Sequence, residues 1–346
     1  MDRNELHQKA NQAWRTAWSR FTHPRTDLFY DFLSSYEPGR ELAHLPTAEE
    51  VARQYPNPYG YGTGMEDCMI SAGVMLSAIL ARHRVTGDAS LKADAQRVFR
   101  GIQLCATVHG VPGFIARGVC PQDAKSVYIN SSRDQYTHCV HGLWEYSRSP
   151  LCGEAAREEI REILQGIAER MTRTVTPEND YDSLRLDGMR DPRGISRMWN
   201  VDAHEAARLP MFYAAAWEVG GDGEHYRLYR RYVAPAIEQS FELHPLTTTY
   251  ALQQMQCSLE LLLALETDAG LKTRMQEAMA MVAERAAGRA ALAGENGRHL
   301  DLTVLSHDWR LTGGPMGDYR KAWYCIRESG EAALTQMMVK GSALPE

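Results

Sequence analysis

The chain has 346 residues, of which 44% are hydrophobic and 24% charged, and this length suits one large helical domain or two average ones. Its formal net charge is −6, its pI is about 6.1, and no run of lysine and arginine stands out. An acidic chain without a basic patch lacks the positive electrostatic potential that attracts nucleic acid, so we expect no nucleic-acid partner.

The composition also bears on compartment. No apolar stretch approaches the roughly 20 residues of a bilayer span, and residues 1–13 lack the apolar core of a signal peptide. The seven cysteines are odd in number and lie mostly within helical patterns, as small buried apolar residues do. We therefore expect a soluble, cytoplasmic protein without membrane partners; a periplasmic or secreted protein whose export signal has been trimmed would look the same.

Apolar residues recur at helical spacing along most of the chain, whereas alternating strand patterns are scarce. The sequence predicts helices over 4–21, 47–54, 64–85, 89–108, 134–148, 153–174, 202–219, 224–240, 247–266, 270–289 and 318–339. Short links join pairs of these helices into antiparallel hairpins, and longer links, at about 109–133, 175–201 and 290–317, follow the hairpins.

Stacked hairpins of this kind place all long links at one end. We predict an all-α, (α/α)6-type toroid formed by residues 1–346 as a single domain. Its inner helices would begin near residues 64, 134, 202, 247 and 318, with their N-terminal ends facing a common cavity. The alternative is an open solenoid whose groove binds a protein.

Two of the expected inner helices begin with acidic residues. Asp67 lies in Thr63-Gly64-Met65-Glu66-Asp67, and Asp134 lies in Ser131-Ser132-Arg133-Asp134-Gln135-Tyr136. Two carboxylates that face one cavity are the minimum equipment for acid/base cleavage of a glycosidic bond. The same stretches also fit capping boxes, Thr63 with Glu66 and Ser132 with Gln135, in which case the acids would only cap helices.

A ring of helical hairpins with one aspartate at the entry of an early inner helix and a second at the entry of the next resembles the six-hairpin glycosidases. The resemblance is greatest to the unsaturated uronyl hydrolases. It implies that Asp134 acts as the general acid/base and that Asp67 assists it.

Several polar and aromatic residues of the links and helix starts are candidates for substrate binding. Arg117 or Arg133 would hold a sugar carboxylate with a planar guanidinium, although an ordinary ion pair is the alternative for each. Trp199, Tyr250 and Trp309 could stack on a pyranose ring or simply pack. The remaining candidates near the predicted cavity are Tyr136, His204, His244 and His307.

No metal or cofactor is predicted. His138 and His141 share a helix face, but no third ligand is visible at a telling distance, and His204-Glu205 lacks the second histidine of a zinc-protease helix. Walker phosphate loops, GxSxG elbows, Rossmann glycine fingerprints and paired CxxC motifs are absent from the sequence.

The sequence leaves three functions open. The first is a glycoside hydrolase that acts on a uronic-acid-containing oligosaccharide through Asp134 and Asp67, with the oligosaccharide as its expected partner. The second is a polysaccharide lyase or sugar epimerase, which would depend on His244, His307 or a tyrosine. The third is a non-catalytic helical-repeat module that binds a glycan or a protein. Nothing in the sequence predicts the oligomeric state.

Overall fold

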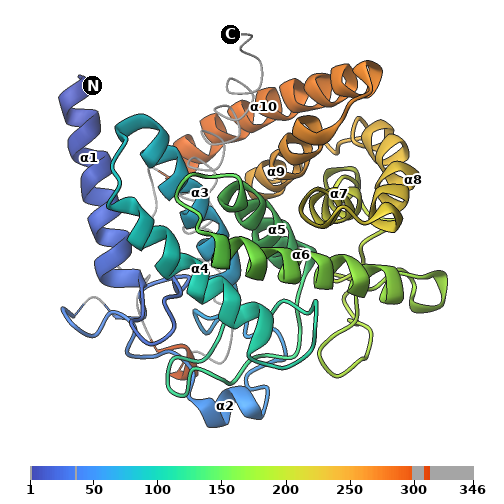
Figure 1. Ribbon diagram of the computed structural model, residues 1–346. Coiled ribbons are helices and arrows are strands. Elements are labelled where there is room, and N and C mark those ends of the chain that lie inside the picture. The colour runs from blue at the N-terminus through green and yellow to red at the C-terminus, as the bar shows by residue number, and fades with distance from the viewer. Residues whose placement is uncertain (1, 36, 298–307, 312–346) are drawn as a thin grey trace.

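The computed structural model describes residues 2–35, 37–297 and 308–311 (Figure 1). Within these residues the chain forms helices and irregular loops, with isolated β-bridges in place of strands. The longer helices are α1 (Arg3–Thr16), α3 (Cys68–Thr86), α4 (Leu91–Thr107), α5 (Arg133–Ser147), α6 (Glu154–Thr174), α7 (Arg208–Gly220), α8 (Gly223–Gln239), α9 (Thr249–Leu265) and α10 (Ala269–Gly297). The predicted all-α fold class is therefore confirmed.

Short helices lie between the longer ones. They are the π-helix η1 (Ala17–Phe21), the single-turn α2 (Ala48–Ala52), and the 3₁₀ helices η2 (Pro177–Asn179), η3 (Ala203–Glu205) and η5 (Trp309–Leu311). The helix predicted over 202–219 is thus a 3₁₀ turn followed by α7. The helix predicted over 318–339, and with it the closure of the ring, lies outside the described residues.

In the part of the chain that the structure describes, the helices pack as four consecutive hairpins: α3 with α4, α5 with α6, α7 with α8, and α9 with α10. The first helix of each hairpin lies in the interior, and the second lies around the outside (Figure 1). The interior helices also contact one another, α3 with α5, α5 with α7 and α9, and α7 with α9. This alternation of inner and outer helices is the one that the toroid prediction requires.

The inner helices carry the hydrophobic core. Helix α9 buries thirteen of its seventeen residues, and the amphipathic outer helices cover it with one apolar face each. The described cysteines are Cys68, Cys105, Cys120, Cys139, Cys152 and Cys257, and all are buried and unpaired, as predicted for small apolar residues.

Helix α3 has 19 residues with a mean hydropathy of 1.2, so its length and composition would allow it to cross a membrane. This corrects the prediction that no apolar stretch approaches such a length. The helix packs against both α4 and α5, and eight of its residues are buried. The core helix of a globular protein has the same properties.

Glycines allow α3 and α5 to approach closely. A Cβ atom added to Gly73 of α3 would lie 2.3 Å from the backbone oxygen of His138, and one added to Gly142 of α5 would lie 3.0 Å from the backbone oxygen of Gly73. Both distances are shorter than ordinary van der Waals contact. This close approach brings together the starts of the two helices, where Asp67 and Asp134 lie.

Candidate active site

A pocket of about 250 Å³ lies where the N-terminal ends of α3, α5, α7 and α9 meet the loops that precede them. Six residues that the sequence singled out line it: Asp67, Arg117, Arg133, Asp134, His204 and Tyr250. The common cavity expected at the starts of the inner helices is therefore present, and it holds both aspartates.

The other predicted binding residues do not line this pocket. Tyr136 is fully buried and its hydroxyl donates to the backbone oxygen of Gly113, so it belongs to the core. Trp199 packs edge-on against Tyr232, with ring centroids 4.7 Å apart. Neither side chain is available to stack on a sugar in the pocket.

The predicted loop residues near the C-terminal part also lie elsewhere. The exposed His244 accepts a hydrogen bond from the backbone N–H of Leu246, which stabilises a turn. The indole N–H of the buried Trp309 donates to the backbone oxygen of His44. His307 lies outside the described residues. A proton-abstracting role for His244 in this pocket is not compatible with its position.

The capping boxes expected at the two acidic motifs do not form. Helix α3 begins at Cys68, its N-cap Asp67 makes no side-chain capping bond, and Ser132 makes none at the start of α5. A capping box forms instead at α2, between Thr47 and Glu50. The two aspartates therefore do not serve as caps, and their carboxylates are directed to other partners.

Asp67 is held by two side chains from other parts of the chain. Its Oδ1 accepts a hydrogen bond of 2.9 Å from Nε2 of Gln135, which is fully buried at the start of α5. Nη1 of Arg117 lies 3.4 Å from the same oxygen and donates to the backbone oxygen of Glu66 at 2.9 Å. The carboxylate is thus oriented from two sides, with about a quarter of its side chain exposed to the pocket.

A second acidic side chain binds the backbone just ahead of α3. Oδ2 of Asp31 accepts the backbone N–H groups of Glu66 and Asp67, at 2.8 and 2.9 Å, while its Oδ1 is buried without a hydrogen-bond partner. Burial, followed by the charges of Asp67 and Glu66, raises the pKa of Asp31 well above its usual value. Burial and the charge of Asp67 likewise raise the pKa of Glu66 to about 7. Asp31 and Glu66, which lie beside Asp67 in an acidic cluster, therefore favour their protonated forms.

Asp134 lies in the opposite electrostatic environment. Burial alone would raise its pKa, but the guanidinium of Arg208, with Nη1 2.6 Å from Oδ1, and the more distant Arg133 and Arg117 outweigh burial and lower it to about 2. Arg208 is itself 1% exposed, and its Nη2 donates to Oε1 of Gln254 on α9 at 2.7 Å. Asp134 is therefore an ionised carboxylate at neutral pH.

Arg133, the residue before Asp134, holds a neighbouring loop in place. Its Nε lies 2.7 Å from Oε1 of Glu205, and its Nη1 donates to the backbone oxygens of Gly194 and Arg197 at 2.6 and 2.7 Å. The ion pair that the sequence left as an alternative is thus present. Because every one of these bonds is internal, Arg133 is a structural support and not a free ligand for a substrate.

His204 lies beside Glu205 at the edge of the pocket, with Nε2 3.6 Å from the Glu205 carboxylate. Burial lowers the pKa of His204 below its usual value, although the charge of Glu205 opposes the shift. At neutral pH this imidazole is uncharged and can accept a proton.

Sequence reasoning missed Arg193, Glu205 and Arg208, which also line the pocket. Arg208 carried a readable signal, since it is a charged residue at the start of the otherwise apolar segment Leu209–Ala216, and a charge on a buried helix requires a partner. Arg193 carried none, because it lies in an irregular loop, and Glu205 was included in the helix predicted over 202–219 without being singled out as a site residue.

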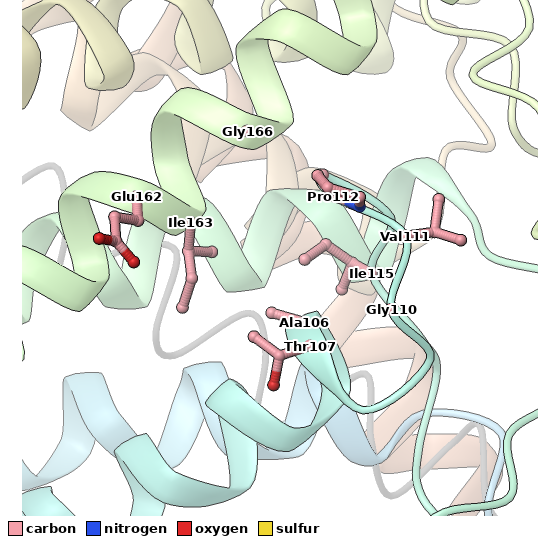
Figure 2. A pocket seen from close by; sticks show the side chains of 10 residues that line it. Ala106, Thr107, Gly110, Val111, Pro112, Ile115, Glu162, Ile163 and Gly166 are labelled. Atoms are coloured by element: carbon pink, nitrogen blue, oxygen red, sulfur yellow. The ribbon is translucent and has the colours of Figure 1, made fainter.

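A second cavity, of about 260 Å³, lies between the end of α4, the loop that follows it and α6 (Figure 2). Its lining is mainly apolar and includes Val111, Pro112, Ile115 and Ile163, with Glu162 at its side. It contains no pair of acidic groups and none of the predicted site residues. Within the described residues, no group of three or more histidine, cysteine, aspartate or glutamate side chains is arranged to hold a metal ion.

The raised pKa of Glu66 predicts how stability depends on pH. The unfolded chain releases this proton near pH 4.5 and the folded chain near pH 7, so the unfolded state binds fewer protons between these values. The free energy of unfolding contributed by Glu66 therefore falls as pH rises from about 4.5 to about 7. Glu66→Gln keeps an acceptor for the Gly62 N–H and should reduce this fall, as measured by urea unfolding across the pH range.

The exposed Glu242 offers a matched control for this measurement. Glu242→Gln should leave the pH profile of unfolding as it is in the wild-type protein. Parallel profiles for wild-type protein and Glu66→Gln would show that Glu66 does not hold the proton.

No protein-family model matches the chain, and no curated protein matches it. Among solved structures, the α-1,6-mannanase GH76A of Salegentibacter sp. HEL1_6 is similar with a TM-score of 0.44 and 14% identity, over 96% of this chain and 98% of that chain. An inactive variant of that enzyme with two aspartates replaced by alanine, in complex with α-1,6-mannotetrose, gives 0.41 and 14%, over 94% and 98%. Similarity at this level assigns no function to the chain, and the resemblance to uronyl hydrolases stays a prediction.

Proposed function

We propose that the protein is a glycoside hydrolase that acts on a uronic-acid-containing oligosaccharide, with Asp134 and Asp67 as the acting carboxylates. The observation that carries the proposal is the contrast between the two sides of one pocket. Arginine neighbours keep Asp134 ionised, whereas Asp67 lies beside Asp31 and Glu66, two carboxyl groups whose pKa values are raised. Environments that separate two carboxyl groups in this way define an acid and a base.

In this mechanism Asp134 accepts a proton from the attacking water molecule. Asp67 is the member of the acidic cluster that lines the pocket, and in this proposal it delivers the proton to the oxygen of the leaving group. Gln135 and Arg117 orient the Asp67 carboxylate, and Arg208 orients Asp134. The uronyl hydrolase resemblance implies that Asp134 acts as both acid and base. We assign it the role of base only, because its low pKa leaves it without a proton in the free protein.

The charge of the pocket supports an anionic substrate. Four arginines and three carboxylates line it, and His204 is uncharged at neutral pH, so the lining carries a surplus of at least one positive charge even when all three carboxylates are ionised. A uronic acid supplies one negative charge per sugar. A neutral oligosaccharide would leave this surplus uncompensated.

A polysaccharide lyase or epimerase is the second candidate, and it is favoured by the uncharged His204 at the pocket edge. Such an enzyme would use this imidazole to remove the proton next to the sugar carboxylate. It would not require a proton donor in the acidic cluster.

Ultraviolet absorbance distinguishes the two candidates. The purified protein is mixed separately with unsaturated and with intact uronide oligosaccharides, and the absorbance of the conjugated double bond is followed. We expect a fall with the unsaturated set, because the unsaturated sugar freed by hydrolysis opens to a keto acid and loses its double bond. Alternatively, we expect release of reducing sugar from the intact set, because hydrolysis of a glycosidic bond frees a reducing end. A rise in absorbance with the intact set would identify a lyase. The proposal would be contradicted if the absorbance did not fall with any unsaturated substrate and no reducing sugar were released from any intact one.

A further inference from the structure

Arg193 differs from the other arginines of the pocket. Arg117, Arg133 and Arg208 are each paired with a carboxylate, Asp67, Glu205 and Asp134 in turn. Arg193 is exposed and lines the same pocket, and within the described part of the chain its contacts are with aromatic rings. The surplus positive charge of the pocket therefore resides on this side chain.

Two tyrosines hold the Arg193 guanidinium at the pocket. The rings of Tyr59 and Tyr61 are parallel to within 2° with centroids 4.9 Å apart, and the Arg193 guanidinium carbon lies 5.2 Å from each centroid. Cation–π contact of this kind attracts the cation without neutralising it. The N–H groups at the rim of the guanidinium remain able to donate to an anion.

The backbone that carries Arg193 is a tight turn. In Asp191-Pro192-Arg193-Gly194, the Gly194 N–H donates to the Asp191 carbonyl at 3.1 Å. Aspartate at the first position, proline at the second and glycine at the fourth are the residues that a type I turn favours. Arg193 therefore occupies the third position of a turn whose conformation its neighbours fix.

Both ends of this turn are anchored to the rest of the site. Asp191 accepts hydrogen bonds from the Tyr59 hydroxyl at 2.6 Å, from Asn130 at 3.0 Å and from the Ile195 N–H at 2.7 Å. Arg133 holds the carbonyl of Gly194 from the other side. The turn is thus tied to the tyrosine pair and to the start of α5, next to Asp134. A side chain on so restrained a turn loses little freedom when it binds a ligand.

We propose that Arg193 binds the carboxylate of the substrate's uronic acid and sets the preference for acidic over neutral sugars. The inference rests on the proposed function for the identity of the substrate. Arg193 replaces Arg117 and Arg133 in the carboxylate-binding role, because those two guanidinium groups are already engaged with protein acceptors. Tyr59 and Tyr61 position its planar fork, which can donate two hydrogen bonds to one carboxylate.

Binding of simple sugars tests the inference without turnover. The full-length protein is titrated with glucuronate and galacturonate, and with glucose and galactose, by calorimetry. We expect the wild-type protein to bind the uronates at least about 10-fold more tightly than the neutral sugars, and Arg193→Gln to remove this preference. Arg193→Lys should retain part of it, since lysine keeps the charge and loses the fork.

Arg190→Gln is the matched control, because Arg190 lies on the same loop, pairs with Asp180 and does not line the pocket. This variant should keep the uronate preference. Equal binding of uronates and neutral sugars by the wild-type protein, or an unchanged preference in Arg193→Gln, would overturn the inference.

Turnover separates this inference from the proposed function. On an acidic oligosaccharide that the wild-type protein cleaves, Arg193→Gln should raise KM by about 10- to 100-fold with little change in kcat, as expected when a binding contact is lost. If uronate preference depends on Arg193 but no oligosaccharide is cleaved, the proposed function fails and the inference stands. If Asp134→Asn abolishes cleavage while Arg193→Gln leaves the preference unchanged, the inference alone fails.

Discussion

Replacement of Asp134 by asparagine is expected to lower kcat by about 10²- to 10⁴-fold, the range measured for the loss of a general acid or base. The physical reason is that an amide cannot accept the proton of the attacking water. Asparagine has nearly the same shape, and its oxygen can still accept the hydrogen bond from Nη1 of Arg208. The measurement is steady-state cleavage of the oligosaccharide that the wild-type protein degrades.

This substitution also affects stability, because Arg208 is 1% exposed and loses its counter-charge. We expect the free energy of unfolding to fall by about 1–3 kcal/mol, as measured by far-ultraviolet circular dichroism during urea unfolding. The helix content in the absence of urea should not change. Asp187→Asn is the control, since Asp187 pairs with Arg185 on the protein surface and does not line the pocket. Nearly full activity in folded Asp134→Asn would show that Asp134 is not the base.

Gly73→Ala is expected to destabilise the protein by about 3 kcal/mol or more, a value typical of severe overpacking in a core. The added methyl group would lie 2.3 Å from the backbone oxygen of His138, which the helix geometry of α5 prevents from moving aside. The two helices would have to separate. The change is measured as a shift of the midpoint of thermal or urea unfolding.

Gly288→Ala provides a control of opposite sign. Gly288 is an exposed glycine of α10, and a Cβ atom added there meets nothing within 4 Å. Alanine at such a helical position stabilises by about 1 kcal/mol. Equal effects of the two substitutions would show that α3 and α5 do not depend on the close approach at Gly73.

The starts of the inner helices were the part of the site that sequence could predict. Asp67 and Asp134 each precede or begin a long apolar run, and the order of short and long links was enough to bring both to one end of the hairpins. The periodic helices were predicted for the same reason. The start of α3 was placed four residues early, because Gly64 to Asp67 are compatible with a first helical turn but follow an irregular path.

The remainder of the site depends on contacts that no local pattern encodes. Asp31 lies in a non-helical segment and reaches the start of α3 across 35 residues of sequence. Arg193 could be assigned to a turn from Asp191-Pro192-Arg193-Gly194, but its place at the pocket depends on Arg133, which lies about 60 residues earlier at the start of α5. Capping was misassigned because the Gln135 side chain binds Asp67 instead of its own helix end.

The hydrogen bonds of Arg133 to the carbonyls of Gly194 and Arg197 connect the start of α5 to the loop that carries Arg193. Arg133 fixes the loop that presents Arg193, and the next residue, Asp134, is the proposed base. A shift of the loop is therefore transmitted to the first turn of α5, and a shift of that turn is transmitted to the loop. Substrate preference and reaction rate are therefore coupled through the backbone of this loop, so variants that gain a new sugar by moving the carbonyls of Gly194 or Arg197, and not only by changing the Arg193 side chain, should also change in kcat.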